Sequence, residues 1–325
     1  MTFNSLLTFW ICRVGRLAAI APLCALGLGL FPVSVPLSKV AFAAQNTNVA
    51  SSLARPAASS SQTKTVPRKA SPAQESTSPF NVKSKIALLV DANTGEELLV
   101  KDADRVVPIA SITKLMTAMV AIDAKPPMDE MLKISDADRD LAMGTTSRLH
   151  VGWTLSREDM LHLALMSSEN RAASALSRYY PGGQPAFLKA MNDKAAALGM
   201  THTHFVNPNG WTSQNVSTGH DLVKLVQAAN QYPLIRQFTT DPSYDVRVSR
   251  YVLPYFNSNR LVGYPDWDIS VQKTGFTNEA GHCLVMRVNA DGRALVMVFL
   301  DAYGKLTRFA DARRVVMQLA IVEKK

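Results

Sequence analysis

The chain has 325 residues, of which 47% are hydrophobic, so it can bury a sizeable core in one large domain or two. Its 35 Lys and Arg outnumber its 26 Asp and Glu, which gives a formal net charge of +9. No run of Lys or Arg exceeds two residues, and aromatic residues do not interleave with them. This spacing argues against a nucleic-acid partner. It indicates a diffuse positive surface, suited to solubility alone or to an anionic polymer.

The first 43 residues have the features of a secretory signal. Arg13 and Arg16 precede an apolar run over 17–30, and residues 41–43 read Ala-Phe-Ala, a small-x-small cleavage site. The alternative is an uncleaved membrane anchor. Prolines oppose that alternative because a spanning helix needs about 20 unbroken apolar residues; they are Pro22, Pro32 and Pro36. We therefore expect a signal peptide over 1–43, and peripheral contact of the mature protein with the membrane surface is left open.

Residues 44–80 are rich in Ser, Ala, Thr, Gln and Pro and contain few bulky apolar side chains. Such a segment cannot bury enough surface to fold, so we expect a disordered linker there and one folded domain over 81–325. The cysteines are at positions 12, 24 and 283, and removal of the signal leaves Cys283 alone. No intramolecular disulfide can then form, and the strand-like run after Cys283 predicts a buried structural thiol.

The domain begins with a strand pattern and continues with helices. Residues 85–91 and 96–101 are rich in β-forming residues and flank an Asn-Thr-Gly turn, which predicts a hairpin. An apolar helix is expected over 111–124, before Pro126 and Pro127. The stretch from about 128 to 232 is mostly helical in pattern. Its helices are expected at 157–166 after a Ser156 cap, at 187–198 before Gly199, and at 220–231 after a Thr218 cap.

After Pro265 the pattern changes back to strands. These are expected at 268–274, 281–288 and 293–301, with an Asp-Gly turn between the last two and a final helix at 309–322. Strands at both ends of the domain, with helices between them, indicate an α/β fold of the α+β type. The N-terminal hairpin and the C-terminal strands would form one antiparallel sheet flanked by helices, with a helical lobe inserted.

Three short motifs carry the candidate chemistry. Ser111 and Lys114 are three residues apart, which places them on one face of the expected helix. A serine hydroxyl is a weak nucleophile until a base takes its proton, and lysine can be that base where burial or another cation favours its neutral form. Ser168-Glu-Asn170 and Lys273-Thr-Gly275 follow along the chain. Each motif occurs by chance, whereas all three in this order are the signature of class A β-lactamases and penicillin-binding proteins.

The residues around these motifs make the resemblance more specific. Segments 108–120, 165–173 and 273–283 are similar to those of the low-molecular-mass penicillin-binding proteins, the serine D-alanyl-D-alanine peptidases, and the similarity runs from about Lys85 to about Arg314. The resemblance implies a DD-peptidase/β-lactamase-like fold with the active site between sheet and lobe. It implies a periplasmic hydrolase without a cofactor, which binds peptidoglycan peptide cross-links and is inhibited by β-lactam antibiotics.

The resemblance also implies catalytic roles. Ser111 would attack the D-alanyl carbonyl and form an acyl-enzyme, with Lys114 as general base. The backbone N–H groups of Ser111 and Phe276 would form the oxyanion hole. Ser168 would relay a proton to the leaving amine, and Asn170 would hydrogen-bond the substrate backbone or Lys114.

The third motif is expected to bind the substrate. By resemblance, Lys273 supplies positive charge and Thr274 hydrogen-bonds the substrate carboxylate. Adjacent strand residues point to opposite faces, so we expect the strand to end near Gly275, where the backbone can twist and approach closely. Three further cations are candidate carboxylate partners: Lys305, Arg308 and Arg313.

Four alternatives are weighed against a DD-endopeptidase that cuts D-alanyl–diaminopimelate cross-links, which the resemblance favours. A DD-carboxypeptidase shares every motif. A β-lactamase needs a glutamate that activates water, and none occurs between Asn170 and Gln272, so penicillins should be released slowly. A zinc peptidase could use His202, His204 and His220, although the chain has no His-Glu-x-x-His motif. The intact motif residues oppose a non-catalytic wall-binding module, and Ser111→Ala would discriminate, because binding should survive it and activity should not.

Overall fold

The computed structural model describes residues 80–139, 147–290 and 292–322. The expected signal over 1–43 lies outside the described residues, as does the expected linker over 44–80 apart from Phe80. Within the described ranges, no helix is long and apolar enough to cross a membrane.

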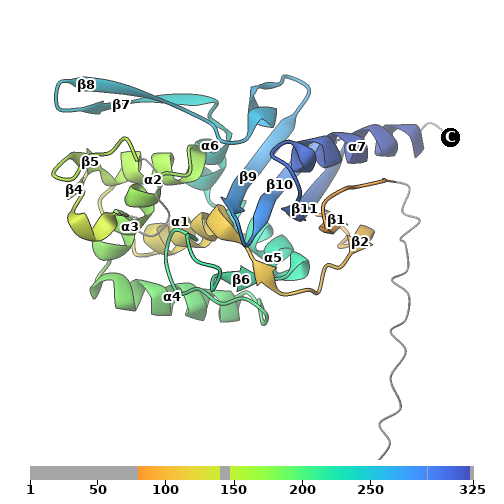
Figure 1. Cartoon of the computed structure of the whole chain (residues 1–325), viewed down its shortest axis with the longest axis horizontal. Helices are drawn as coiled ribbons and strands as arrows, with labels where there is room; N and C mark the ends of the chain where they lie inside the picture. Colours follow the sequence, from red (N-terminus) through yellow and green to blue (C-terminus); the bar gives the residue numbers. More distant parts are fainter. Residues whose placement is uncertain (1–79, 140–146, 291, 323–325) are drawn as a thin grey trace, which may run out of the picture. The chain divides into compact units, whose positions relative to one another are not determined.

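A five-stranded antiparallel sheet has the strand order β2-β1-β11-β10-β9 (Figure 1). Its strands come from the two ends of the domain: β1 (Ile86–Asp91), β2 (Glu97–Lys101), β9 (Asp268–Thr277), β10 (Gly281–Ala290) and β11 (Arg293–Ala302). β1 pairs with β11, with Ile86 opposite Leu300. The expected pairing of the N-terminal hairpin with the C-terminal strands is therefore confirmed.

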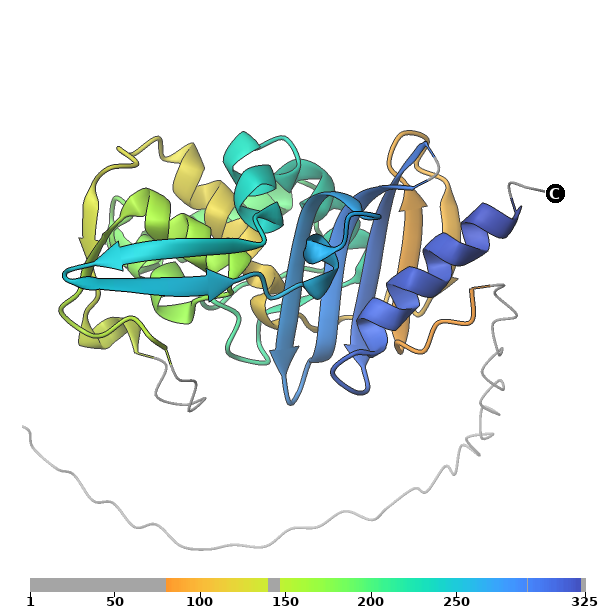
Figure 2. The same cartoon turned by 90° about the horizontal axis from the view of Figure 1, so that it is seen from above.

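Both faces of this sheet are covered, which explains why β1 is buried along its whole length and apolar from Ile86 to Val90 instead of alternating. On one face Leu89 packs in a layer with α7 (Thr307–Val322), and Figure 2 shows this helix lying across the strands. Phe80 is buried in the same layer, so it belongs to the folded domain and not to the linker. On the opposite face Leu88 joins the core of α5 (Gly219–Ala229) and the helical lobe.

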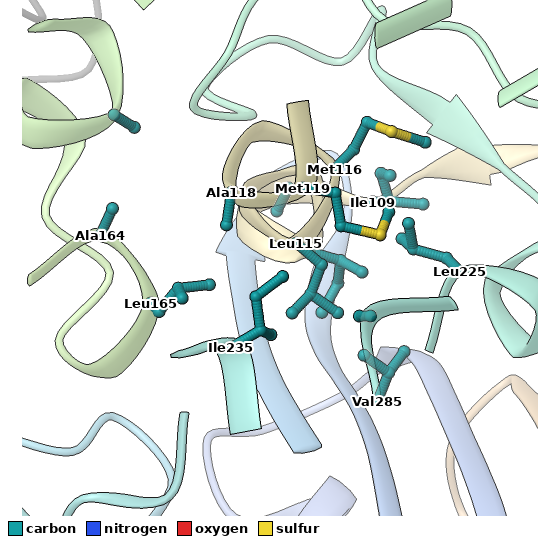
Figure 3. Packing of buried hydrophobic residues seen from close by; sticks show 14 of the residues in the cluster. Ile109, Leu115, Met116, Ala118, Met119, Ala164, Leu165, Leu225, Ile235 and Val285 are labelled. Atoms are coloured by element: carbon teal, nitrogen blue, oxygen red, sulfur yellow. The ribbon is translucent and has the colours of Figure 1, made fainter. Parts of the chain in front are cut away.

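Helix α1 (Thr113–Asp123) is the centre of the helical lobe, and it is buried from Thr113 through Ala121. A helix that is buried on every side is a core helix, so its apolar run shows little amphipathic pattern. Figure 3 shows Leu115 directed into the space shared by Leu165 and Ile235 of the lobe and Val285 of the sheet. The neighbouring helices are α2 (Arg157–Met166), α3 (Asn170–Arg178), α4 (Gly183–Ala197) and α6 (Pro233–Thr240).

Several short elements were not predicted from the sequence. They are the strand pairs β3 (Val107–Pro108) with β6 (Val216–Ser217) and β4 (Met131–Lys133) with β5 (Thr154–Ser156), and the 3₁₀ turns η1 (Ala110–Ile112), η2 (Asp136–Asp138) and η3 (Arg260–Gly263). A hairpin of β7 (Ser243–Val248) and β8 (Tyr251–Phe256) runs over the lobe (Figure 2). Its turn has no Gly, Asn or Pro, and β8 contains Pro254, so the sequence lacked the usual hairpin signals.

Two boundaries bear on the site. The expected helix at 111–124 begins as the 3₁₀ turn η1, so Ser111 lies in a tight turn and α1 starts at Thr113. The strand expected to end near Gly275 continues to Thr277. The Lys-Thr-Gly motif therefore lies inside β9, and the expectation of a strand end there was wrong.

Candidate active site

Residues of the first two motifs come from separate segments and meet at Lys114. The Lys114 Nζ donates to Ser111 Oγ and to Asn170 Oδ1, with both distances 2.7 Å. Ser111 comes from η1, Lys114 from the first turn of α1, and Asn170 from the first position of α3. The i, i+3 spacing brings Ser111 and Lys114 together, and packing of α3 against α1 brings Asn170 to them.

The Lys114 side chain is completely buried. Its Nζ makes a third short contact, 2.7 Å, with the backbone oxygen of Asn209, which lies 3.4 Å from Ser111 Oγ. An amide oxygen and a backbone carbonyl oxygen can only accept hydrogen bonds, whereas a hydroxyl can accept or donate. Two N–H bonds of Lys114 are therefore donated to Asn170 Oδ1 and to the Asn209 backbone oxygen. The remaining contact of Nζ is with the Ser111 hydroxyl, which can donate or accept.

A second lysine is buried beside the first. Lys273 is 0% exposed, and its Nζ donates to the Thr274 backbone oxygen at 3.0 Å. Burial holds the pKa of Lys273 well below its usual value of 10.5, and the charges of Lys114 and Arg308 lower this pKa further. Two buried ammonium groups that lie close together repel each other and have lost their hydration, which favours a state in which one of the two lysines is neutral. A neutral amine can accept a proton.

The Ser111 turn is held in an uncommon backbone conformation. Ala110 has φ +47°, in the left-handed region that non-glycine residues rarely adopt. A Cβ on Gly210 would lie 2.0 Å from the Ala110 oxygen, and a Cβ on Gly275 would lie 3.2 Å from the Ser111 nitrogen. Both glycines therefore allow backbone contact with the turn, and Gly275 brings the third motif directly beside the Ser111 N–H.

Ser168 lies in the turn between α2 and α3, where a loop between two helical runs was expected. Its φ is +66°, so its backbone is left-handed, like that of Ala110 just before the first motif. The turn is closed by the Glu169 N–H, which donates to the Leu163 oxygen at 3.0 Å. The Glu169 carboxylate accepts from the Arg171 N–H, so it caps α3. The turn holds the Asn170 side chain against Lys114. Ser168 lies in the same turn, two residues before Asn170.

Lys273 and Thr274 point to opposite faces of β9. Lys273 is paired with Val285, which belongs to the layer under the lobe, and Thr274 is paired with Leu284, which belongs to the layer under α7. The Thr274 hydroxyl donates to Ser258 Oγ at 2.7 Å. Only the lysine of the pair therefore faces Lys114, while the threonine lies against the segment that follows β8.

The loop that supplies the Asn209 carbonyl was missed in the sequence. The Asn215 side chain holds this loop to α1, because its Nδ2 donates to Thr113 Oγ1 at 3.0 Å and to the Asn207 oxygen at 2.9 Å. Asn-Pro-Asn-Gly at 207–210 is a strong turn signal. That signal predicts a loop, but it does not show that one of its backbone oxygens contacts a lysine.

The three candidate carboxylate partners differ in their surroundings. Arg308 is buried, and its Nε has no hydrogen-bond partner among the described residues. Burial lowers the pKa of Arg308 to about 10, and its charge acts on Lys273. The Arg313 guanidinium instead lies over the ring of Tyr264, 4.7 Å from its centroid. Lys305 is exposed. Of these three cations, Arg308 is the one whose charge acts on Lys273 of the third motif.

The remaining sequence candidates lie apart from this site. His220 lies between Glu97 and Asp104, and the His202 backbone N–H donates to Asp221. The parts of the chain that the structure describes contain no group of three or more His, Cys, Asp or Glu side chains that could hold a metal ion. Cys283 is a free, buried thiol, as predicted, and burial raises its pKa to about 11.

Comparison with known proteins identifies the fold and the family. Residues 72–304 match the peptidase S11 family, described as D-alanyl-D-alanine carboxypeptidase. This chain belongs to that family. It is a serine-type D-Ala-D-Ala peptidase with the DD-peptidase fold, so the α/β fold expected from the strand and helix pattern is confirmed.

Similar proteins of known name fall in the same class. The D-alanyl-D-alanine endopeptidase of Pseudomonas aeruginosa is 54% identical over 70% of this chain and 74% of its own length. The D-alanyl-D-alanine endopeptidase of Escherichia coli is 50% identical over 72% of this chain and 76% of its own length. The structure of penicillin-binding protein D2 from Listeria monocytogenes in its cefotaxime-bound form has a TM-score of 0.65 and 29% identity, and covers 73% of this chain and 97% of its own.

Proposed function

We propose that this protein is a periplasmic DD-endopeptidase, which hydrolyses D-alanyl–diaminopimelate cross-links of peptidoglycan through an acyl-enzyme on Ser111. The observation that carries the proposal is the contact of the buried Lys114 Nζ with Ser111 Oγ and Asn170 Oδ1. The choice of endopeptidase rests on the names of the two relatives at 54% and 50% identity. The secretory features of residues 1–43 support export, and those of 44–80 support a linker to the catalytic domain.

Lys114 acts as the general base for acylation. In its neutral form, two N–H bonds go to Asn170 and Asn209, and the lone pair accepts the Ser111 proton. Burial of Lys114 favours this neutral form, because an ammonium group loses its hydration there. The serine oxygen then attacks the D-alanyl carbonyl carbon, and the proton passes to the lysine.

The backbone N–H groups of Ser111 and Phe276 stabilise the oxyanion that forms on the D-alanyl oxygen. The close approach at Gly275 supports this role, since it brings β9 to the Ser111 nitrogen at backbone distance. One such donor is worth about 3 kcal/mol of activation free energy. The φ of +47° at Ala110 orients the turn for this task, and residues held in strained backbone conformations often serve catalysis.

The leaving amine needs a proton before it departs. Ser168 relays this proton from Lys114 to the leaving amine. Its position supports the role, because it lies two residues before Asn170, whose side chain contacts Lys114. The carbon that carries the leaving nitrogen also carries a carboxylate, which binds Arg308 and the hydroxyl of Thr274. A buried guanidinium whose Nε lacks a partner among the described residues is suited to such an anion.

The acyl-enzyme is then hydrolysed by water. The absence of glutamate between Asn170 and Gln272 supports slow release of penicillins, because class A β-lactamases use a glutamate for that step. β-Lactam antibiotics should therefore acylate Ser111 and stay attached. The family description, D-alanyl-D-alanine carboxypeptidase, makes removal of terminal D-alanine the second candidate activity.

The two activities can be separated with purified muropeptides. The mature protein is incubated with a cross-linked tetrapeptide dimer and, separately, with a monomeric pentapeptide, and the products are separated by chromatography. We expect conversion of the dimer to monomers to be the faster reaction, and Ser111→Ala to abolish both. Release of terminal D-alanine without dimer cleavage would replace the endopeptidase by a carboxypeptidase.

A further inference from the structure

Phe276 and His282 form an exposed aromatic surface at the edge of the sheet. They are cross-strand partners in the β9–β10 pairing, so their side chains share one face. The two rings are stacked, with centroids 4.3 Å apart and planes inclined by 22°. Phe276 remains 51% exposed, so the face of its ring that is turned away from His282 is open to a ligand. We call these two side chains the aromatic shelf.

The backbone that carries the shelf runs beside the nucleophile, since a Cβ on Gly275 would lie 3.2 Å from the Ser111 nitrogen. Side chains alternate along β9, so the Phe276 ring lies on the face of Thr274, toward α7, and not on the face of Lys273. At its other side the shelf is close to two cations, because Arg308 and Lys305 both act on the charge of His282. A substrate whose carboxylate is bound by Thr274 and Arg308 therefore reaches the face of β9 that carries the shelf.

The shelf itself carries little charge. Burial, followed by the charges of Arg308 and Lys305, holds the pKa of His282 below its ordinary value of 6.5. The imidazole is therefore neutral at neutral pH, and its Nδ1 has no hydrogen-bond partner among the described residues. The result is an uncharged, largely apolar surface next to two positive charges, which fits a ligand with an aliphatic chain and a carboxylate on the same carbon.

The two candidate substrates differ in the group attached to that carbon. In a terminal D-alanyl-D-alanine the carbon that bears the scissile nitrogen carries a carboxylate and a methyl group. In a D-alanyl–diaminopimelate cross-link it carries the same carboxylate and a chain of three methylenes that leads to the second peptide stem. The cations recognise the carboxylate of both substrates, so they cannot discriminate between them. Only a surface under the longer chain can do so.

We infer that the aromatic shelf binds the trimethylene chain of the leaving diaminopimelyl residue and so selects cross-links over terminal D-alanine. This inference rests on the proposed function, and it assigns to Phe276 the preference for cross-links over terminal D-alanine. An aliphatic chain laid on an aromatic face removes apolar area from water, and this gain is nearly absent for a single methyl group. Loss of the Phe276 ring should therefore weaken transition-state binding of the cross-link much more than that of the pentapeptide.

The test compares kcat/KM for a cross-linked tetrapeptide dimer with kcat/KM for a monomeric pentapeptide. The two substrates share the D-alanyl carbonyl and the carboxylate and differ in the leaving side chain. We expect Phe276→Ala to lower the ratio of dimer to pentapeptide about tenfold, and Phe276→Met, which keeps a long apolar side chain, to lower it less than threefold. The matched control is Tyr251→Ala, since Tyr251 is also a half-exposed strand residue stacked on a ring, that of Trp153. It should leave the ratio as in wild type.

The remaining outcomes separate this inference from the proposed function. An equal fall of both kcat/KM values in Phe276→Ala would mean that the ring supports only the Ser111 turn, and it would overturn the shelf. An unchanged ratio in Phe276→Ala, with a wild type that cleaves the dimer, would overturn the shelf alone. A wild type that releases terminal D-alanine but leaves the dimer intact would overturn the endopeptidase assignment and the shelf together.

Discussion

Lys114 and Lys273 are two completely buried lysines whose charges act on each other, one from the first turn of α1 and one from the middle of β9. Such a pair destabilises the fold, because each amine has lost its water and repels the other. The same repulsion favours a state in which one of the two amines is neutral. The pair is therefore expected to lower the stability of the fold and, at the same time, to favour a neutral amine, which acylation of Ser111 requires.

Replacement of Lys273 by methionine should separate these two effects. Lys273→Met keeps the volume of the side chain and removes a desolvated charge, so the free energy of unfolding should rise by about 1–3 kcal/mol. Acylation by benzylpenicillin should fall about 100-fold or more. Thermal unfolding and stopped-flow acylation measure the two quantities, with Lys189→Met at an exposed position as the control. A less stable, fully active variant would contradict this account of the lysine pair.

Replacement of Asn170 tests the geometry of the base. Asn170→Ala removes one acceptor from the buried Lys114 Nζ, and the loss of a hydrogen bond to a charged or ionisable group costs about 1.5–3 kcal/mol, roughly 10- to 150-fold in acylation rate. Asn170→Asp keeps the shape but adds a negative charge that favours the ammonium form of the lysine. We therefore expect the aspartate variant to acylate no faster than the alanine variant at neutral pH. A nearly wild-type aspartate variant would show that Lys114 does not act as a neutral base.

Two glycines with the same backbone conformation provide a test of the Ser111 turn. Gly210 has φ +79° and Gly95 has φ +78°, but a Cβ on Gly210 would lie 2.0 Å from the Ala110 oxygen, whereas a Cβ on Gly95 meets nothing within 4 Å. Gly95→Ala should cost about 1–2 kcal/mol of stability, the usual penalty of a left-handed residue. Gly210→Ala should cost at least 3 kcal/mol and should also slow acylation, because Ala110 must move. Denaturant unfolding of both variants gives the comparison, and equal losses would argue against a tightly packed turn.

His162 should make stability depend on pH. Its ring is buried and stacked between Phe238 and Tyr244, and it faces the carboxylates of Asp241 and Asp159. Burial lowers the pKa of His162 below 6.5, although the two carboxylates oppose the shift.

The folded state therefore binds fewer protons at His162 than the unfolded state does, so this contribution to stability is present above about pH 6.5 and is lost as the pH falls toward the lower folded pKa. His162→Phe should flatten this part of the stability curve below about pH 6.5, while His202→Gln, at an exposed position, should leave it as in wild type. A curve that keeps its slope in His162→Phe would assign the dependence to other groups.

The sequence predicted the parts of the fold and site that depend on local pattern. The i, i+3 spacing placed Ser111 beside Lys114, and the apolar runs placed the strands of the central sheet. The contact of Asn170 with Lys114 spans 56 residues and was expected only through the resemblance to a known family.

What was missed has no residue signature of its own. The acceptor at position 209 is a backbone oxygen, which every residue type possesses, and the left-handed φ of Ala110 is imposed by packing against Gly210. The end of the strand at Gly275 was misplaced because glycine weakens a strand on its own, whereas pairing with β10 carries β9 through it to Thr277.

The most direct test of the central claim is the intact mass of the mature protein after incubation with benzylpenicillin, beside its Ser111→Ala variant. We predict a persistent increase equal to one penicillin on the wild type and none on the variant, with the adduct located on the peptide that contains Ser111. An adduct on the variant, no adduct on either protein, or rapid penicillin hydrolysis without an adduct would contradict a slowly released acyl-enzyme on this serine.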